Sequence, residues 1–72
     1  MMEPYELLRD KREDMNMNQE QLAKELGIGQ SYLSQLERGI QAITAKVIRK
    51  YTVVMPLTDD DILFLLGFRE VE

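Results

Sequence analysis

A short spacer, Gly-Ile-Gly at residues 27–29, separates two helical patterns within the stretch NQEQLAKELGIGQSYLSQLERG, residues 18–39. Asn18 is a favoured N-cap, and Gln21 follows three residues later, where its side chain can complete a capping box. A spacer this short allows two helices to cross at about 90–120°, provided that small residues lie at the contact and at the bend. The stretch therefore predicts a tight two-helix unit.

The apolar residues of this two-helix unit, residues 19–38, determine which side chains face outward. They recur at the spacing of a buried helix face and are Leu22, Ala23, Leu26, Ile28, Leu33 and Leu36. Four uncharged hydrogen-bonding side chains are then left outside on the second helix: Gln30, Ser31, Ser34 and Gln35. In the major groove of DNA, glutamine can pair with adenine and serine can address several bases. The alternative is an ordinary solvated helix face, but the two-helix pattern favours DNA contact.

The sequence outside this unit predicts further helices and no strand. A first helix begins at Pro4, which suits the first helical position, and ends at Asn16, which tolerates a left-handed conformation. A fourth helix covers residues 44–55, and Pro56 prevents its continuation. Its expected inward side chains are Ile48, Tyr51, Thr52 and Met55.

A fifth helix, at residues 58–66, begins with a threonine cap and three aspartates. The run Asp59-Asp60-Asp61 invites a metal site, but calcium loops spread their ligands over about 12 residues around a glycine bend. Negative charge in the first turn of a helix explains the run better. With the third helix at residues 30–38, we expect one all-α domain of five helices over residues 1–72.

Composition excludes several classes of function. The 72 residues include no cysteine and no histidine, which argues against a zinc site, a redox function and histidine-based catalysis. No nucleophile–base pair or phosphate-binding loop is visible, so we expect neither an enzyme nor a cofactor. The net charge of −4 weighs against nucleic acid, but residues 15–51 carry five basic and three acidic side chains. This mildly basic middle is compatible with DNA.

No segment suggests a membrane protein. The longest wholly apolar run is residues 62–66, far short of the roughly 20 residues that a membrane helix needs. The first residues have no basic stretch leading into an apolar run, as a secretory signal would. We therefore expect a cytoplasmic protein.

The core QEQLAKELGIGQSYLSQLERG resembles the lambda-repressor-like helix-turn-helix family, also called the Cro/repressor or XRE type. The resemblance extends from about Leu8 to Met55. It implies a compact five-helix domain, usually dimeric, that represses or activates transcription at an inverted repeat. It also implies that Gln19 holds a DNA phosphate and that Arg12 and Glu37 form a buried ion pair. The base-reading positions of the family match Gln30, Ser31, Ser34 and Gln35.

The sequence departs from the family pattern at three places. Lys11 stands where the family has an apolar residue, so the first helix is expected to pack differently. Gly29 replaces the usual serine or threonine cap, which weakens the helix start by a few tenths of a kcal/mol. The loop at residues 40–43 lacks the basic residues and proline common in the family, and with them a set of phosphate contacts.

Other residues near the two-helix unit have two interpretations. Tyr32 either lies along a phosphate backbone or covers the helix junction. Lys46, Arg49 and Lys50 contact phosphates at the edge of a site or form the solvated face of the fourth helix. The complete set of expected DNA-binding residues is Gln19, Gln30, Ser31, Tyr32, Ser34, Gln35, Arg38 and Lys46.

The fifth helix has almost no polar face after its first turn. Ile62, Leu65 and Leu66 are expected to close the core of the protomer. The opposite face would expose three apolar side chains, Leu63, Phe64 and Phe68. A contiguous apolar patch usually marks an interface, so we expect a dimer through this helix.

Together, these observations predict a homodimeric, sequence-specific DNA-binding transcriptional regulator, more specifically a repressor. Its partner would be double-stranded operator DNA, and a regulatory protein partner is also possible. The alternative is a protein-binding module on the same fold, such as an antirepressor or antitoxin-type regulator. The acidic ends and the uncharged loop after the third helix favour that alternative.

Overall fold

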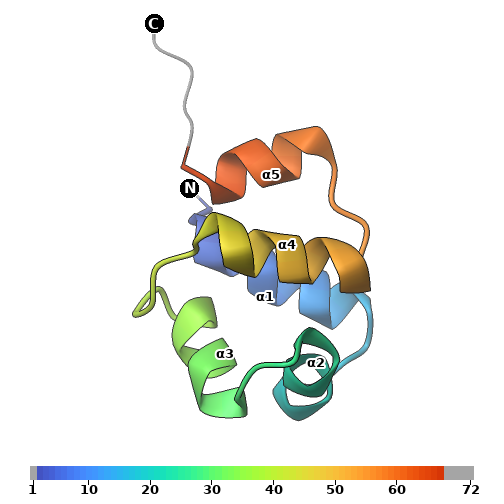
Figure 1. The fold of residues 1–72 in the computed structure, drawn as a ribbon. Coiled ribbons are helices and arrows are strands. Elements are labelled where there is room, and N and C mark those ends of the chain that lie inside the picture. Colours follow the sequence, from blue (N-terminus) through green and yellow to red (C-terminus); the bar gives the residue numbers. More distant parts are fainter. Residues whose placement is uncertain (1, 68–72) are drawn as a thin grey trace, which may run out of the picture.

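Five helices follow one another in the computed structural model, which describes residues 2–67 (Figure 1). Their bounds are α1 Pro4–Asp14, α2 Gln19–Leu26, α3 Gln30–Glu37, α4 Ala45–Val54 and α5 Asp59–Leu65. No strand occurs within residues 2–67. The all-α architecture of five helices expected from the sequence is therefore confirmed.

Short polar side chains fix the starts of three helices. The Asn18 side chain accepts a hydrogen bond from the Gln21 backbone at 2.8 Å, and the Gln21 side chain accepts one from the Asn18 backbone at 2.9 Å. Thr58 and Asp61 make the same reciprocal pair at the start of α5, at 3.0 and 3.1 Å. Thr44 accepts from a backbone N–H at the start of α4. Each such cap stabilises its helix by about 1 kcal/mol.

Helix α1 connects the two ends of the molecule. Figure 1 shows α2 and α3 at one end of the molecule and α5 at the other. Helix α1 contacts α3 on one side and α5 on the other, while α4 packs on α2. The core between them consists of Leu8, Leu22, Ala23, Leu26, Leu33, Leu36, Val47, Ile48, Tyr51, Met55 and Leu65. Complete burial of a leucine side chain stabilises the fold by roughly 1.5–3 kcal/mol.

The structure corrects the expected buried faces of α4 and α5. Thr52, expected to point inward, is exposed, and Val47 is buried instead. Successive helical residues are rotated by about 100°, so the face centred on Tyr51 and Met55 includes Val47 and turns Thr52 to its rim. At the end of α5, Leu66 is 40% exposed rather than buried. Phe64, expected to be exposed, is half-buried.

Lys11, which stands where the family has an apolar residue, connects α1 to α5. Its Nζ lies 3.1 Å from Asp61 Oδ2, and both side chains are largely shielded from solvent. The backbone hydrogen bond with Thr58 is the main cause that lowers the pKa of Asp61, and Lys11 lowers it further. Asp61 thus caps its own helix and binds α1, which gives the charged residue at position 11 a structural role.

Gly39 ends α3 where no larger residue fits. Its φ of +77° lies in the left-handed region. A Cβ at this position would lie 2.8 Å from both Cδ1 and Cε1 of Tyr5. The ring of Tyr5 therefore packs directly on the glycine backbone and holds the loop after α3 against α1.

Candidate nucleic-acid interface

The turn between α2 and α3 is closed by a left-handed glycine. Gly27 has φ +72°, and the backbone N–H of Ile28 donates to the Ala23 carbonyl at 3.0 Å. The Ile28 side chain packs beneath the turn against the core. This arrangement directs the chain from α2 into α3 within three residues.

The start of α3 presents polar side chains to solvent. Gln30 and Ser31 are exposed, whereas Ser34 and Gln35, one turn later, are half-buried. Leu33 and Leu36, on the opposite side of the helix, are fully buried. The helix has no side-chain cap at Gly29, so its first turn leaves backbone N–H groups available beside the exposed side chains.

A buried charge pair fixes the orientation of α3 relative to α1. Glu37 is only 2% exposed. Arg12 donates from Nε to Glu37 Oε2 at 2.9 Å and from Nη2 to Oε1 at 3.0 Å. Its third contact, from Nη1 to the Met17 carbonyl at 2.9 Å, also secures the α1–α2 loop. The hydrogen bond with Glu37 raises the pKa of Arg12, although burial opposes this change.

Gln19 joins the same charge pair. Its Nε2 donates to Glu37 Oε1 at 3.1 Å, so the first residue of α2 is tied to the last residue of α3. An amide NH₂ group has two N–H donors. One donor of Gln19 is therefore used within the fold, and the other has no hydrogen-bond partner among the described residues.

The other expected DNA-binding residues lie around α3 in different environments. Tyr32 is half-buried and packs against the core, which places it at the helix junction. Arg38 is exposed, and its Nε donates to the Ser34 carbonyl at 3.3 Å. Lys46 is exposed in the first turn of α4. Helix α4 begins directly after the loop that follows α3 (Figure 1).

One further residue, which the sequence did not predict, lies beside these side chains. Gln41, in the loop after α3, donates from Nε2 to Gln35 Oε1 at 2.9 Å. No periodic pattern marks a loop side chain that folds back on a helix, so the sequence offered no signal for this contact.

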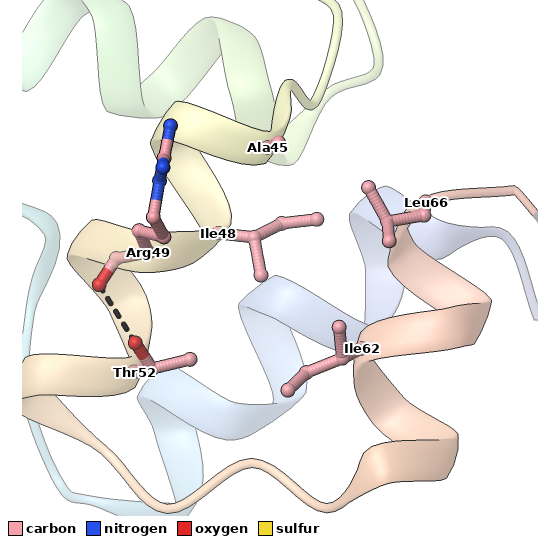
Figure 2. A pocket seen from close by; sticks show the side chains of 6 residues that line it. All are labelled: Ala45, Ile48, Arg49, Thr52, Ile62 and Leu66. Atoms are coloured by element: carbon pink, nitrogen blue, oxygen red, sulfur yellow. Dashed lines mark hydrogen bonds between the residues drawn. The ribbon is translucent and has the colours of Figure 1, made fainter.

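A separate apolar groove lies between α4 and α5. It has a volume of about 250 Å³ and is lined by Ala45, Ile48, Arg49, Thr52, Ile62 and Leu66. Figure 2 shows Ile48, Ile62 and Leu66 around the opening between the two helices. In the same view Arg49 extends away from the groove, and the Thr52 hydroxyl donates to the Arg49 carbonyl at 2.7 Å. Leu63, on α5, is 49% exposed.

Comparison with known proteins identifies the family. The helix-turn-helix family model matches residues 8–62, which include all of α2, α3 and α4. The chain belongs to the XRE-type helix-turn-helix family. This helix-turn-helix protein is accordingly a DNA-binding transcription regulator, in a family of regulators rather than of enzymes.

A phage protein is similar to this helix-turn-helix protein. The "ImmF control region 10 kDa protein" of Bacillus phage phi105 is 30% identical over 66 residues, which are 92% of this chain and 72% of the phage protein. No solved structure shows a significant match. Within the described part of the chain, no helix is long and apolar enough to cross a membrane, and no cluster of acidic side chains could hold a metal ion.

Proposed function

We propose that this helix-turn-helix protein is a homodimeric repressor that binds an inverted-repeat operator with α3 in the major groove. The observation that carries the proposal is the exposure of Gln30 and Ser31 at the start of α3, on a helix held by the buried Arg12–Glu37 pair. The N-terminal residues of a recognition helix are the ones that reach base edges. A fixed helix presents them in one orientation.

Phosphate contacts would supply the remaining affinity. The exposed cations Arg38 and Lys46 lie at the end of α3 and at the start of α4. Gln19, at the start of α2, retains one amide donor as described above. Such contacts position a protein on the duplex without reading its sequence.

A dimer would use the apolar surface of α5. Leu63 and Leu66 are 49% and 40% exposed, and Leu66 is continuous with the groove between α4 and α5. Of the three residues expected at the dimer interface, Leu63 is available, Phe64 is half-buried and Phe68 lies outside the described residues. A symmetric dimer buries the same patch on both protomers, and to bind two half-sites one DNA turn apart it would have to hold its two α3 helices about 34–36 Å apart.

Repression requires fewer surfaces on the protein than activation does. A protein that occupies an operator excludes polymerase from the same DNA, whereas activation also requires a surface that contacts polymerase. The similar phage protein is named for a control region, which agrees with a regulatory role in the same class.

A selection of random DNA duplexes on the purified protein, at near-physiological salt and followed by sequencing, tests the proposal. Enrichment of an inverted repeat with half-sites about one turn apart is the expected result. Affinity for the enriched site should fall steeply with salt, because bound phosphates release counterions. Folded dimeric protein that enriches no sequence would refute the proposal.

The alternative is a protein-binding module on the same fold. The exposed Ile40, 61% accessible in the loop after α3, favours this alternative because an apolar side chain there suits a protein contact better than a phosphate. Binding to a protein partner would be less sensitive to salt than binding to DNA. The salt dependence of binding therefore separates the two functions.

A further inference from the structure

We propose that Gln41 is a positioning residue that sets which group of the Gln35 amide faces the DNA. The Nε2 group of Gln41 donates to Gln35 Oε1 at 2.9 Å. The inference rests on the proposed function, because Gln35 is taken as a base-reading residue of α3. It assigns to the loop after α3 a role in sequence preference rather than in phosphate binding.

The backbone of the loop holds Gln41 beside Gln35. The N–H groups of Ile40 and Gln41 both donate to the Gln35 carbonyl, at 2.9 and 3.3 Å. Gly39 donates to the Leu36 carbonyl at 3.2 Å and is packed under the Tyr5 ring. The loop is thus anchored both to the last turn of α3 and to α1. Gln41 and Gln35 are consequently neighbours in the folded protein before any DNA is bound.

The chemistry of an amide makes this contact directional. A glutamine side chain has one acceptor oxygen and one NH₂ donor group. Because Gln41 offers an N–H to the Gln35 oxygen, the Gln35 NH₂ group is the part that is left for a base. Donors pair with the acceptors of the major groove, which are purine N7, guanine O6 and thymine O4. Fixing the side chain in advance also reduces the ordering cost of binding.

A positioning role of Gln41 can be distinguished from a direct contact between Gln41 and DNA. A residue that touched DNA itself would contribute independently of Gln35. A positioning residue acts only through Gln35, so its removal has no effect once Gln35 is truncated. Gln30, at the other end of α3, supplies an internal control, because no hydrogen bond joins it to Gln41 within the described residues.

The test measures base discrimination rather than affinity alone. Operators that carry each of the four base pairs at every half-site position are bound to the wild-type protein, Gln41→Ala, Gln35→Ala and the double variant. Gln35→Ala identifies the base pair that Gln35 reads. Gln41→Ala should lower discrimination at that pair about 3- to 10-fold. The double variant should match Gln35→Ala, and discrimination at the pair read by Gln30 should not change.

A second substitution reverses the direction of the contact. In Gln41→Glu the carboxylate can only accept, so the Gln35 NH₂ group turns toward it and leaves its oxygen for the base. Preference at that pair should shift toward bases with a donor, adenine N6 or cytosine N4. The added negative charge weakens binding to all sequences equally and therefore cancels from the discrimination ratio.

The outcomes separate this inference from the proposed function. If the wild-type protein binds selectively but Gln41→Ala leaves base discrimination unchanged, the role of Gln41 is overturned and the repressor proposal stands. Independent effects of the two substitutions in the double variant lead to the same conclusion. Lack of any selective binding by the wild-type protein overturns the repressor proposal and this inference with it. Circular dichroism of each variant shows whether the fold is retained, and a folded Gln41→Glu variant with unaltered preference also counts against the inference.

Discussion

Arg12 and Glu37, which are 25 residues apart in the sequence, form two parallel hydrogen bonds of 2.9 and 3.0 Å. The pair joins α1 to the last residue of α3, and only 12% of the Arg12 side chain and 2% of the Glu37 side chain are exposed. Removal of one member of such a pair leaves the other charge buried without its partner.

Glu37→Leu should therefore lower the free energy of unfolding by about 3–5 kcal/mol, measured by urea denaturation. The double variant Arg12→Met/Glu37→Leu should recover much of this loss, because an apolar pair of similar volume carries no unpaired buried charge. Equal instability of the single and double variants would show that the cost comes from packing and not from the charge.

Tyr51→Phe should keep or raise stability. The side chain is completely buried, and its hydroxyl has no hydrogen-bond partner in the structure described. A buried polar group without a partner costs about 1–3 kcal/mol, and phenylalanine keeps the ring that fills the core. A thermal melt at neutral pH that shows a clear loss of stability would contradict this expectation.

The same substitution should change how the free energy of unfolding depends on pH in the alkaline range. Burial raises the pKa of Tyr51, and the Glu37 carboxylate raises it further while Arg12 opposes the change. The unfolded chain loses this proton near pH 10, so the native state holds more protons above that pH and its stability falls. Below pH 10 the contribution is intact. Tyr51→Phe should flatten the decline in stability above about pH 10.

Gly39→Ala should destabilise the protein more than Gly27→Ala. Both glycines have positive φ, +77° and +72°, which costs an alanine roughly 1–2 kcal/mol. At Gly27 a Cβ meets nothing within 4 Å, whereas at Gly39 it would meet the Tyr5 ring. Addition of Tyr5→Leu to Gly39→Ala should relieve part of the difference. Equal midpoints of urea unfolding for the two single variants would refute the close packing.

Leu63→Glu should convert the proposed dimer to monomers in light scattering, because a charge in the centre of an apolar interface is left without a partner. Val53→Glu is the matched control, since Val53 is 86% exposed and does not line the groove between α4 and α5. Phe64 is a poorer choice for this test because its ring is already half-buried in the protomer. An unchanged mass for Leu63→Glu would place the dimer surface elsewhere.

Gln30→Ala should relax base preference at one position of each half-site and cost about 1–3 kcal/mol of specific binding. Titration of the enriched operator and of its single-base variants measures this directly. The wild-type preference should persist at all other positions. An equal loss on every sequence would indicate that Gln30 contacts a phosphate instead of a base.

The sequence predicted features that depend on neighbouring residues better than those that depend on distant contacts. The predicted Asn18–Gln21 capping box and the predicted Thr58 cap each join residues three positions apart, and their hydrogen bonds are present. The Lys11–Asp61 bridge joins residues 50 positions apart, and no local pattern could indicate it.

The other differences between the predicted and the observed structure concern the rotation of a helix face and the direction of a loop side chain. Thr52 satisfies a three- and four-residue spacing as well as Val47 does, and only the packing of α4 on the rest of the fold decides between them. Gln41 lies in a loop, where periodicity gives no information about side-chain direction. At the candidate interface, the exposure of Gln30 and Ser31 followed from the pattern of the buried leucines of α3. Ser34 and Gln35 were expected on the same outer face and are half-buried instead.

Lys11 and Arg12 are consecutive residues, yet one binds α5 and the other binds α3. A single turn of α1 therefore fixes the distance between the surface proposed for dimerisation and the helix proposed for DNA reading. In such a dimer, α1 helps to set the separation of the two half-sites that the protein can bind. An extra base pair between the half-sites would move them apart by about 3.4 Å and rotate them by roughly 35°, so two α3 helices held in one dimer geometry would no longer meet both half-sites. Operator spacing should then be as strictly selected as operator sequence.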